Sequence, residues 1–401
     1  MAKINTSATI DTAKENEKQE DDKKTKQDKI DKQYPPVPPV DYAVNPETLM
    51  DTIESIFNTY CYLPGKYDSK VLSIWAGLSY VYDCFEYSPR IALTSALPGS
   101  GKSTVLKLLA EVSNKSKRFS GMSYAMMKSH IHNYKATMFL DEADTWLKDP
   151  NHEIYGMLNN GFEVGGIVAN MHPIRTDEEQ EYEIYAPVAI ARNGRLTNRA
   201  FETRCISIRM QPQPKGNNLP QVRLTNPKFK TRIKTIQSEI VTVTNAIKPK
   251  FYGYPKLPDA LNNRYRDIWE PMISLADNIS QKWSEAIRNA SIEYSKETEK
   301  QLGDHFLVQL LEDIKAIMDK HFLDTGDQFI KSTDLVEKLN SMVEKDYSTC
   351  WHGRSNLTPQ RLGIYLKNFE IKSEQFTRKD DPAGRYTNNK YYFMKSFETV
   401  W

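Results

Sequence analysis

A glycine-rich segment at 96–104, reading ALPGSGKST, has residue types and spacing suited to holding phosphate. Glycines permit a tight turn in which successive backbone N–H groups point at one anion, and a helix starting after the turn adds a favourable dipole. Ala96 stands where the motif G-x-x-x-x-G-K-[ST] has its first glycine. Alanine is small and this position ends a strand, so we expect the turn to form. The residues expected to bind phosphate are Pro98, Gly99, Ser100, Gly101, Lys102, Ser103 and Thr104.

The side chains of this loop predict nucleotide chemistry that needs a metal ion. Lys102 is suited to reach the β- and γ-phosphates, and Ser103 to ligate Mg²⁺. Downstream, Asp141 ends an apolar run in the segment FLDEAD and can hold the Mg²⁺ shell through water. Glu142 beside it can orient and deprotonate a water, which favours hydrolysis of ATP over transfer to an acceptor. The plainer interpretation is that Asp141 and Glu142 only begin a solvated turn.

The letters DEAD at 141–144 suggest an RNA helicase of that name, but the motifs that follow are in a different order. Asn193 follows an apolar strand and could hydrogen-bond the γ-phosphate or the water. Arg204 ends a short helix, where it would face a neighbouring subunit's nucleotide, and Arg199 is its rival. Arg264 opens a helix and could sense the γ-phosphate from a lid. Each of these side chains could instead be a surface or salt-bridged residue.

These residues require strands to position them. Apolar runs at 90–95, 137–141, 186–191 and 205–210 read as buried strands, and 103–112 as a helix. Strands alternating with helices predict an α/β fold with a mainly parallel sheet covered on both faces. Helical spacing marks 47–63 and 69–82, the pattern is helical from about 226 to 321, and short mixed elements follow from 328.

Composition limits the remaining choices. Of 401 residues, 39% are hydrophobic and the net charge is +2. Residues 1–34 mix eight lysines with eight acids, so we expect disorder there, followed by a proline-rich spacer. The four cysteines lie far apart, which argues against a zinc site or disulfide framework. We find no targeting segment or bilayer-length apolar run and expect a cytoplasmic protein without membrane contact.

In order, these motifs resemble the AAA+ branch of P-loop ATPases. More closely, 45–400 resembles an uncharacterised family of phage, plasmid and mobile-element proteins, a "domain of unknown function" often labelled helicase or primase-associated ATPase. Blocks that carry the resemblance include the loop at 98–102, 140–145, 158–161, 186–191, Trp269-Glu270-Pro271, 357–362 and 384–386.

The resemblance implies ATP and Mg²⁺ as cofactors and a homo-oligomer, with a hexameric ring as one form. The expected organisation is a tail at 1–44, an N-terminal helical segment at 45–88, an ATPase core at 89–222, a helical lid at 223–325 and a winged helix at 326–401.

Three features concern DNA as a partner. Apolar segments at 166–171 and 182–186 flank a polar tip with His172 and Arg175, like a pore hairpin of hexameric helicases, although a structural hairpin fits as well. Residues 223–256 carry eight Lys or Arg against one acid, Glu239, which is either a phosphate-binding stretch or a solvated face. The predicted winged helix places Gln360, Arg361 and Lys367 on its recognition helix, although winged helices also dock proteins.

We therefore expect a DNA-directed ATPase, a helicase or replication initiator of a phage or mobile element. The alternative is an ATP-dependent DNA-bound regulator or assembly factor without unwinding activity. A small-molecule kinase is a third reading that leaves Glu142, the lid and the wing without a role.

Overall fold

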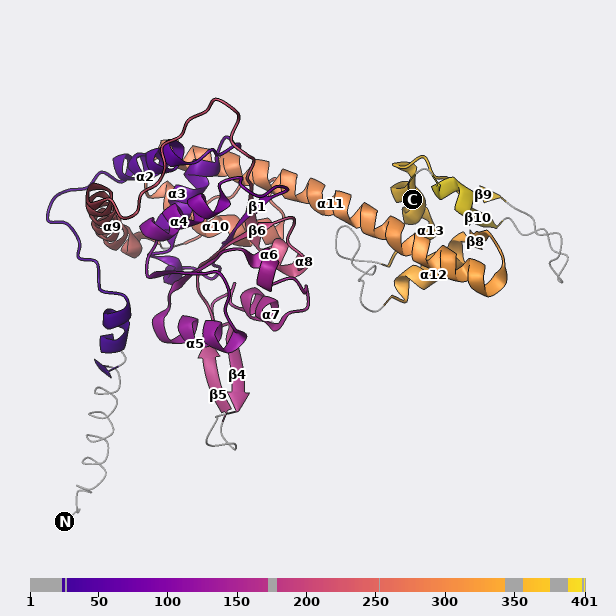
Figure 1. The fold of residues 1–401 in the computed structure, drawn as a ribbon, viewed down its shortest axis with the longest axis horizontal. Coiled ribbons are helices and arrows are strands. Elements are labelled where there is room, and N and C mark those ends of the chain that lie inside the picture. Colours follow the sequence, from indigo (N-terminus) through magenta and orange to yellow (C-terminus); the bar gives the residue numbers. More distant parts are fainter. Residues whose placement is uncertain are drawn as a thin grey trace, which may run out of the picture. The chain divides into compact units, whose positions relative to one another are not determined.

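A computed structural model describes residues 24–25, 27–171, 179–251, 253–342, 356–375, 389–398 and 400, without the side chains of 301–305. The chain divides into two compact units, Met1–Ser295 and Lys296–Trp401. The boundary falls inside helix α11 (Gln281–Thr325). Figure 1 labels elements of both units, among them α4, β1 and β6 of the first and α12, α13 and β10 of the second.

The first unit is built on a five-stranded parallel sheet with the order β2-β3-β6-β1-β7. Its strands are β1 (Arg90–Ser95), β2 (Ser116–Phe119), β3 (Thr137–Leu140), β6 (Val188–Asn193) and β7 (Cys205–Arg209). Ser95 pairs with Asn193, and Leu140 with Ile190. The segments that follow β1, β3 and β6 therefore start side by side, at the carboxyl ends of the strands.

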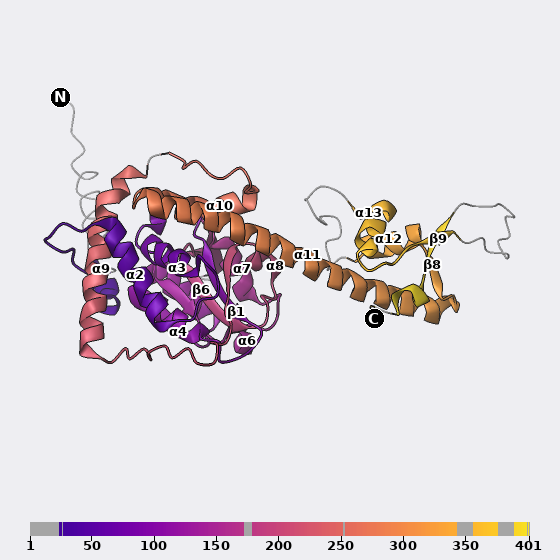
Figure 2. The ribbon, with the colours of Figure 1, turned by 90° about the horizontal axis from the view of Figure 1, so that it is seen from above.

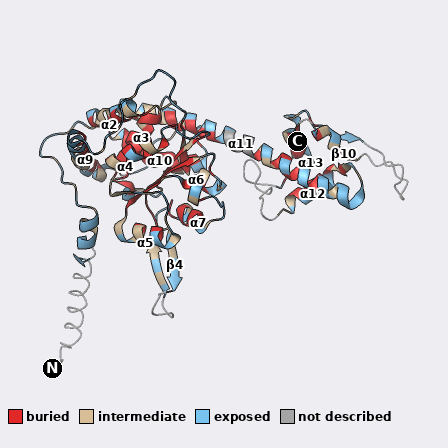
Figure 3. Ribbon diagram, viewed as in Figure 1, coloured by how far each residue is buried: buried red, intermediate tan, exposed pale blue. Residues whose placement is uncertain are grey.

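Helices cover both faces of this sheet, because successive strand residues point to opposite sides. Ile91 and Leu93 of β1 pack into one buried cluster, while Ala92 between them belongs to the other. The first cluster includes residues of α2 (Pro46–Tyr60), α3 (Asp68–Leu78), α4 (Lys102–Val112), α9 (Pro227–Ile247) and α10 (Asn263–Asp277). The second face carries α5 (Tyr124–Tyr134), α6 (Ala143–Trp146) and α7 (Glu153–Asn160), with Phe201 of α8 (Arg199–Glu202). In Figure 3 the buried residues concentrate along the sheet and the helix faces turned toward it.

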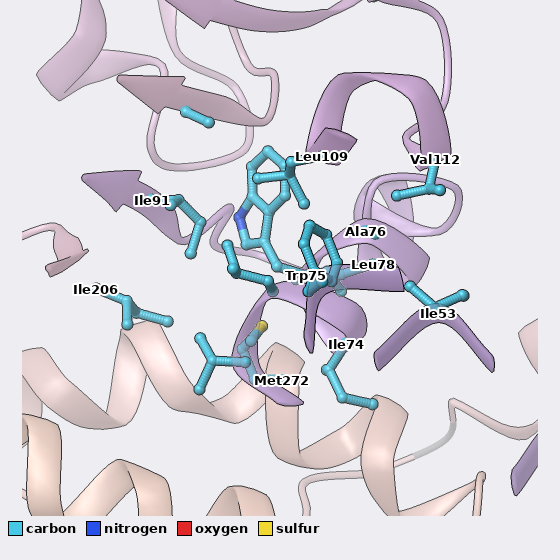
Figure 4. Close-up of a cluster of buried hydrophobic side chains, with 14 of the residues drawn as sticks. Ile53, Ile74, Trp75, Ala76, Leu78, Ile91, Leu109, Val112, Ile206 and Met272 are labelled. Carbon is cyan, nitrogen blue, oxygen red and sulfur yellow. The ribbon is translucent and has the colours of Figure 1, made fainter. Parts of the chain in front are cut away.

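The N-terminal helices belong to this core rather than to a separate layer. Trp75 of α3 is 1% exposed, and its indole Nε1 donates to the carbonyl of Pro89 over 2.7 Å. Figure 4 shows Trp75 among side chains such as Ile91 of β1, Leu109 of α4 and Met272 of α10. Close packing of this kind fixes α4 against β1, and so holds both ends of the loop between them.

A two-stranded antiparallel hairpin, β4 (Ile167–Met171) and β5 (Glu179–Glu183), projects from the unit (Figure 1). The predicted tip at 172–178, with His172 and Arg175, lies outside the described residues. Lys128 of α5 holds the stem: its ammonium bonds Asn170 Oδ1 and lies 4.0 Å from the ring centre of Tyr182. Burial lowers the pKa of Lys128.

The second unit combines the end of α11 with α12 (Ser332–Asn340), α13 (Pro359–Lys367) and a small antiparallel sheet ordered β8-β10-β9. The strands are β8 (Phe329–Lys331), β9 (Glu374–Gln375) and β10 (Lys390–Phe393). Leu335, Leu362 and Tyr392 are among the residues of its own buried cluster. Gln360, Arg361 and Lys367, expected on a recognition helix, lie on α13, and residues 376–388 lie outside the described residues.

The α/β fold with a parallel sheet is confirmed. Strand β2 was not predicted, because Ser-Lys-Arg-Phe has neither an apolar run nor alternation, and its edge position requires neither. Residues 27–33 are helical where we predicted disorder, and Tyr34 then packs on α5 through a 2.6 Å bond to His130 Nε2. Among the described helices, none has the length and apolarity to cross a bilayer.

Candidate active site

The phosphate loop joins β1 to α4 through two glycines in left-handed conformation. Gly99 has φ 75° and Gly101 φ 85°, values that a residue with a Cβ adopts only at a cost. An added Cβ at Gly99 would meet nothing within 4 Å, so this glycine is required by backbone conformation rather than by space. Gly101 is the N-cap of α4 and has no capping side chain. The N-terminal end of α4 is therefore open to an anion.

Lys102 lies at the centre of the site and is 8% exposed. Its ammonium donates to Ser95 Oγ (2.5 Å), Ser100 Oγ (3.2 Å) and Asn193 Oδ1 (2.9 Å), which are all neutral oxygens. Burial lowers the pKa of Lys102, while the charges of Asp144 and Asp141 oppose the shift. A partly desolvated cation held by neutral acceptors is well placed to gain from an incoming phosphate.

Ser103 and Asp141 meet across the loop. Ser103 Oγ donates to Asp141 Oδ1 over 3.1 Å, and the Glu142 N–H donates to the same oxygen over 3.0 Å. Asp141 follows β3 directly, and Ser103 is in the first turn of α4. A hydroxyl and a carboxylate this close are oxygen ligands of the type that Mg²⁺ prefers. The two residues expected to bind a metal therefore lie within hydrogen-bonding distance of each other.

Glu142 borders the space between the phosphate loop and Asp141, and its backbone conformation is unusual. Its φ of 50° is left-handed, and it is the N-cap of α6. Its side chain is exposed. Strain of this kind costs on the order of 1–3 kcal/mol and is often found where a side chain must be presented in a fixed direction.

Asn193 is held by Asp144, a residue with no predicted role. The Asn193 N–H donates to Asp144 Oδ1 (2.8 Å), and Asn193 Nδ2 donates to Asp144 Oδ2 (3.0 Å). Burial alone would raise the pKa of Asp144, but the two bonds from Asn193, together with a bond to its own backbone and the charge of Arg192, outweigh burial and the pKa is lowered. Asn193 thus connects the carboxylate of Asp144 to the ammonium of Lys102. The signal in the sequence was the spacing of Asp141 and Asp144, which puts both carboxylates at the start of α6.

These residues enclose one cavity of about 200 Å³. Its lining comprises Pro98, Gly99, Ser100, Gly101, Lys102, Ser103, Asp141, Glu142, Asp144, Ala191, Arg192 and Asn193. Arg192 was also missed: it follows the predicted strand at 186–191 and in the structure belongs to β6, where its guanidinium bonds Tyr155 and Thr197. Thr104 does not line this cavity and instead borders another, described below. The open loop, the lysine and the hydroxyl–carboxylate pair together fit a Mg²⁺–nucleoside triphosphate.

Arg204 and Arg264 lie at the amino ends of the strands, opposite the end that carries the phosphate loop. Arg204 precedes β7, and its carbonyl accepts the N–H of Arg90, the first residue of β1. The five steps from Arg90 to Ser95 separate this end from the phosphate loop by about 17 Å. Arg264, second residue of α10, acts electrostatically on Arg204 and is 3.8 Å from Asp267. Neither arginine lines the cavity of its own chain.

Within its own chain Arg264 therefore lies away from the phosphate cavity, and sensing of a γ-phosphate from a lid stays a prediction. Burial, followed by the charge of Arg264, lowers the pKa of Arg204. The Arg204 guanidinium bonds the Ala200 carbonyl (2.7 Å) and lies 5.8 Å from the ring centre of Phe162. Arg199, the rival, is exposed at the start of α8.

Comparisons with solved structures give distant likenesses. The apo A form of the NrS-1 C-terminal region is 12% identical, with a TM-score of 0.34, over 89% of this chain and 76% of that one. JCV helicase bound to a thiazolopyridine-containing acetamide is 12% identical, with a TM-score of 0.25, over 63% of this chain and 69% of that one.

Among curated proteins, an uncharacterized 28.9 kDa protein in the xis 5′ region of Saccharopolyspora erythraea is 26% identical over 139 residues. The match covers 35% of this chain and 49% of the relative, so the chain spans about half the length of that protein. A family model matches the C-terminal part, beginning at the last residue of β7, and therefore contains Arg264 but not Lys102, Asp141 or Asn193. Residues 209–401 are similar to the family described as "Protein of unknown function (DUF3631)".

Proposed function

We propose that this chain is a Mg²⁺-dependent ATPase of the AAA+ type whose hydrolysis is coupled to DNA binding or remodelling. The observation that carries the proposal is the convergence of Lys102, the Ser103–Asp141 pair and Asn193 on one small cavity at the N-terminal end of α4. A structural salt-bridge network would not need two left-handed glycines and an uncapped helix start beside it.

The residues divide the work as follows. The loop N–H groups and Lys102 bind the β- and γ-phosphates and place negative charge where the helix dipole favours it. Ser103 and Asp141 would hold Mg²⁺, which supplies charge neutralisation on the phosphate oxygens when bound. Glu142 orients the lytic water and takes its proton. Asn193, fixed by Asp144, hydrogen-bonds the γ-phosphate or that water.

Arg204 requires a second copy of the chain in this scheme. Within one chain it lies a full strand length from the phosphate loop, so it contributes only where this end of the strands meets the cavity of a neighbour. Arg264 beside it is subject to the same constraint. A homo-oligomer, with a hexameric ring as one form, follows from this role. In this proposal the second unit is a winged helix that contacts DNA through α13.

Two substitutions test the ATPase. Lys102→Ala should abolish ATP binding measured by calorimetry, because it removes the cation of the phosphate site. Glu142→Gln should bind ATP with unchanged Kd and hydrolyse it far more slowly, since only the water loses its base. Glu142→Gln activity equal to that of the unsubstituted chain would refute the assignment. Stimulation of hydrolysis by DNA is the further expectation, and a rate that is the same with and without DNA would refute coupling.

The alternative is an ATP-dependent DNA-bound regulator or assembly factor. The exposed residues Gln360 and Lys367 of α13 would serve this alternative as well, because DNA contact through α13 does not require unwinding. A strand-displacement assay separates the two functions: ATP-dependent binding without displacement of a labelled strand favours the regulator.

A further inference from the structure

A second cavity, of about 680 Å³, lies beside α4 and is lined by cations. Its walls come from α4, from Arg118 of β2, from Tyr60 at the end of α2 and from the linker after β7. Figure 2 shows this linker passing below α4 on its way to the start of α9. We call this second cavity the basic cavity. Its lining is Tyr60, Thr104, Lys107, Arg118, Gln213, Leu219, Pro220, Gln221, Val222, Arg223, Leu224 and Thr225.

The charge of the basic cavity has one sign. Lys107, Arg118 and Arg223 are exposed, and the described residues that line it include no Asp or Glu. Glu111, one turn beyond Lys107 on α4, is the nearby acid; burial raises its pKa, while Arg118 and Lys230 act in the opposite direction. Three cations around a concave surface with no carboxylate in its lining attract an anion by field focusing.

The positive charge continues from the basic cavity along α9. Lys228, Lys230, Arg232 and Lys234 are all exposed on the first two turns of this helix. Because residues two apart lie on different faces of a helix, Lys230 and Lys234 share one face of α9 and extend over about 6 Å, at 1.5 Å per residue. Lys230 connects them to the basic cavity, because it and Arg118 act on the same carboxyl of Glu111. The surface is therefore longer than one phosphate group and suits a chain of phosphates.

The lining also offers room and apolar surface for a base. Tyr60 is half-buried, with its ring edge-to-face against Phe229 at 5.8 Å, and Leu219, Val222 and Leu224 add aliphatic surface. Bases of a single strand can turn into such a hollow and contact an aromatic ring, whereas paired bases in a duplex cannot. A peptide of acidic residues alone would use the cations but not this surface.

We propose that the basic cavity and the cationic start of α9 bind single-stranded nucleic acid, with backbone phosphates on Lys107, Arg118 and Arg223 and a base against Tyr60. This locates the DNA partner of the proposed function on the chain, and it rests on that function only for the link to hydrolysis. The link is α4 itself: its first residues, Lys102 and Ser103, line the phosphate cavity, and Thr104 and Lys107 line the basic cavity.

The test is binding of a short fluorescein-labelled oligo(dT) to the full chain without ATP, followed by anisotropy. The variant is Lys107→Gln, Arg118→Gln and Arg223→Gln together. Each lost phosphate contact reduces the magnitude of the slope of log K against log salt by about 0.7. Loss of three contacts should therefore weaken binding by about 100-fold at 0.1 M salt. The control variant combines Lys66→Gln, Lys250→Gln and Lys256→Gln and removes the same charge outside the basic cavity. Lys250 and Lys256 belong to the same basic segment, 223–256, as Arg223. This control should change the Kd by less than about threefold.

Three results would overturn the proposal: equal loss of affinity in the control, unchanged affinity in the triple variant, or displacement of oligo(dT) by poly-glutamate at the same charge concentration as by unlabelled oligo(dT). A triple variant that loses ATP affinity but keeps oligo(dT) affinity would also overturn it and would assign the cavity to the nucleoside part of ATP. Loss of oligo(dT) binding in a chain that proves to have no ATPase activity would support this site while the proposed function fails.

Discussion

Replacing Asp144 by asparagine separates positioning of Asn193 from binding of the nucleotide. Asp144 accepts two bonds from Asn193 with two separate oxygens, at 2.8 Å and 3.0 Å. An asparagine amide has one oxygen, so in either orientation one of the Asn193 donors faces an NH₂ group. One hydrogen bond to a charged acceptor is then lost.

Such a bond is worth about 1.5–3 kcal/mol, and because Asp144 is only half-buried we take the lower end. If Asn193 acts on the γ-phosphate or the water in the transition state, about 1.5 kcal/mol lowers kcat about tenfold. The Kd for ATP should stay within about twofold, because Lys102 keeps its bonds to Ser95 and Ser100. Steady-state ATPase kinetics and calorimetric ATP binding measure the two quantities.

A double-mutant cycle then decides whether Asp144 works through Asn193. Asn193→Ala should lower kcat at least as far, and adding Asp144→Asn to it should cause no further loss. Asp149→Asn, a matched removal of one carboxylate in the loop after α6, should leave kcat unchanged. Additive losses of kcat, or a rise in Kd with unchanged kcat, would refute the argument that Asp144 positions Asn193.

Two further predictions concern the cations. The pKa of Lys102 is lowered by burial below its ordinary value of 10.5, and bound phosphate would raise it, so the Kd for ATP should be constant below the lowered pKa and rise up to tenfold per unit as pH climbs above it. Lys102→Arg should remove this dependence. Mixing Arg204→Ala with Lys102→Ala chains, each inactive alone, should restore part of the ATPase activity if Arg204 acts on a neighbour's site; absence of any rescue would contradict a shared site.

The parallel sheet and the phosphate loop were predictable because both are local in the sequence. Four apolar runs marked strands, and the loop falls between one of them and an amphipathic helix. Even the departure at Ala96 had little effect, since both glycines that adopt left-handed φ, Gly99 and Gly101, come later in the motif. The Ser103–Asp141 pair was predictable because Ser103 belongs to the loop motif and Asp141 ends an apolar run.

Strand order could not be read from the sequence, and this hid Asp144 and Arg192. Because β6 lies between β1 and β3, Asn193 reaches both Lys102 and Asp144, a contact that depends on neighbours 49 and 91 residues away. Arg192, directly after the predicted strand at 186–191, had no predicted role and nevertheless lines the cavity. The basic run at 223–256 was visible as composition, but only folding shows that its first part joins Lys107 and Arg118 while Lys250 and Lys256 lie elsewhere.

The two ends of the parallel strands contribute differently to the proposed function. At the carboxyl ends of β1, β3 and β6, one chain assembles the phosphate cavity completely from its own residues. At the other end, Arg204 and Arg264 place two like charges together near Glu163 and Asp267, with burial lowering the pKa of Arg204. Like charges held together cost free energy in the isolated chain. An anion from a second copy would offset that cost, which is why we expect ATP binding without the arginines and efficient hydrolysis only in the assembly.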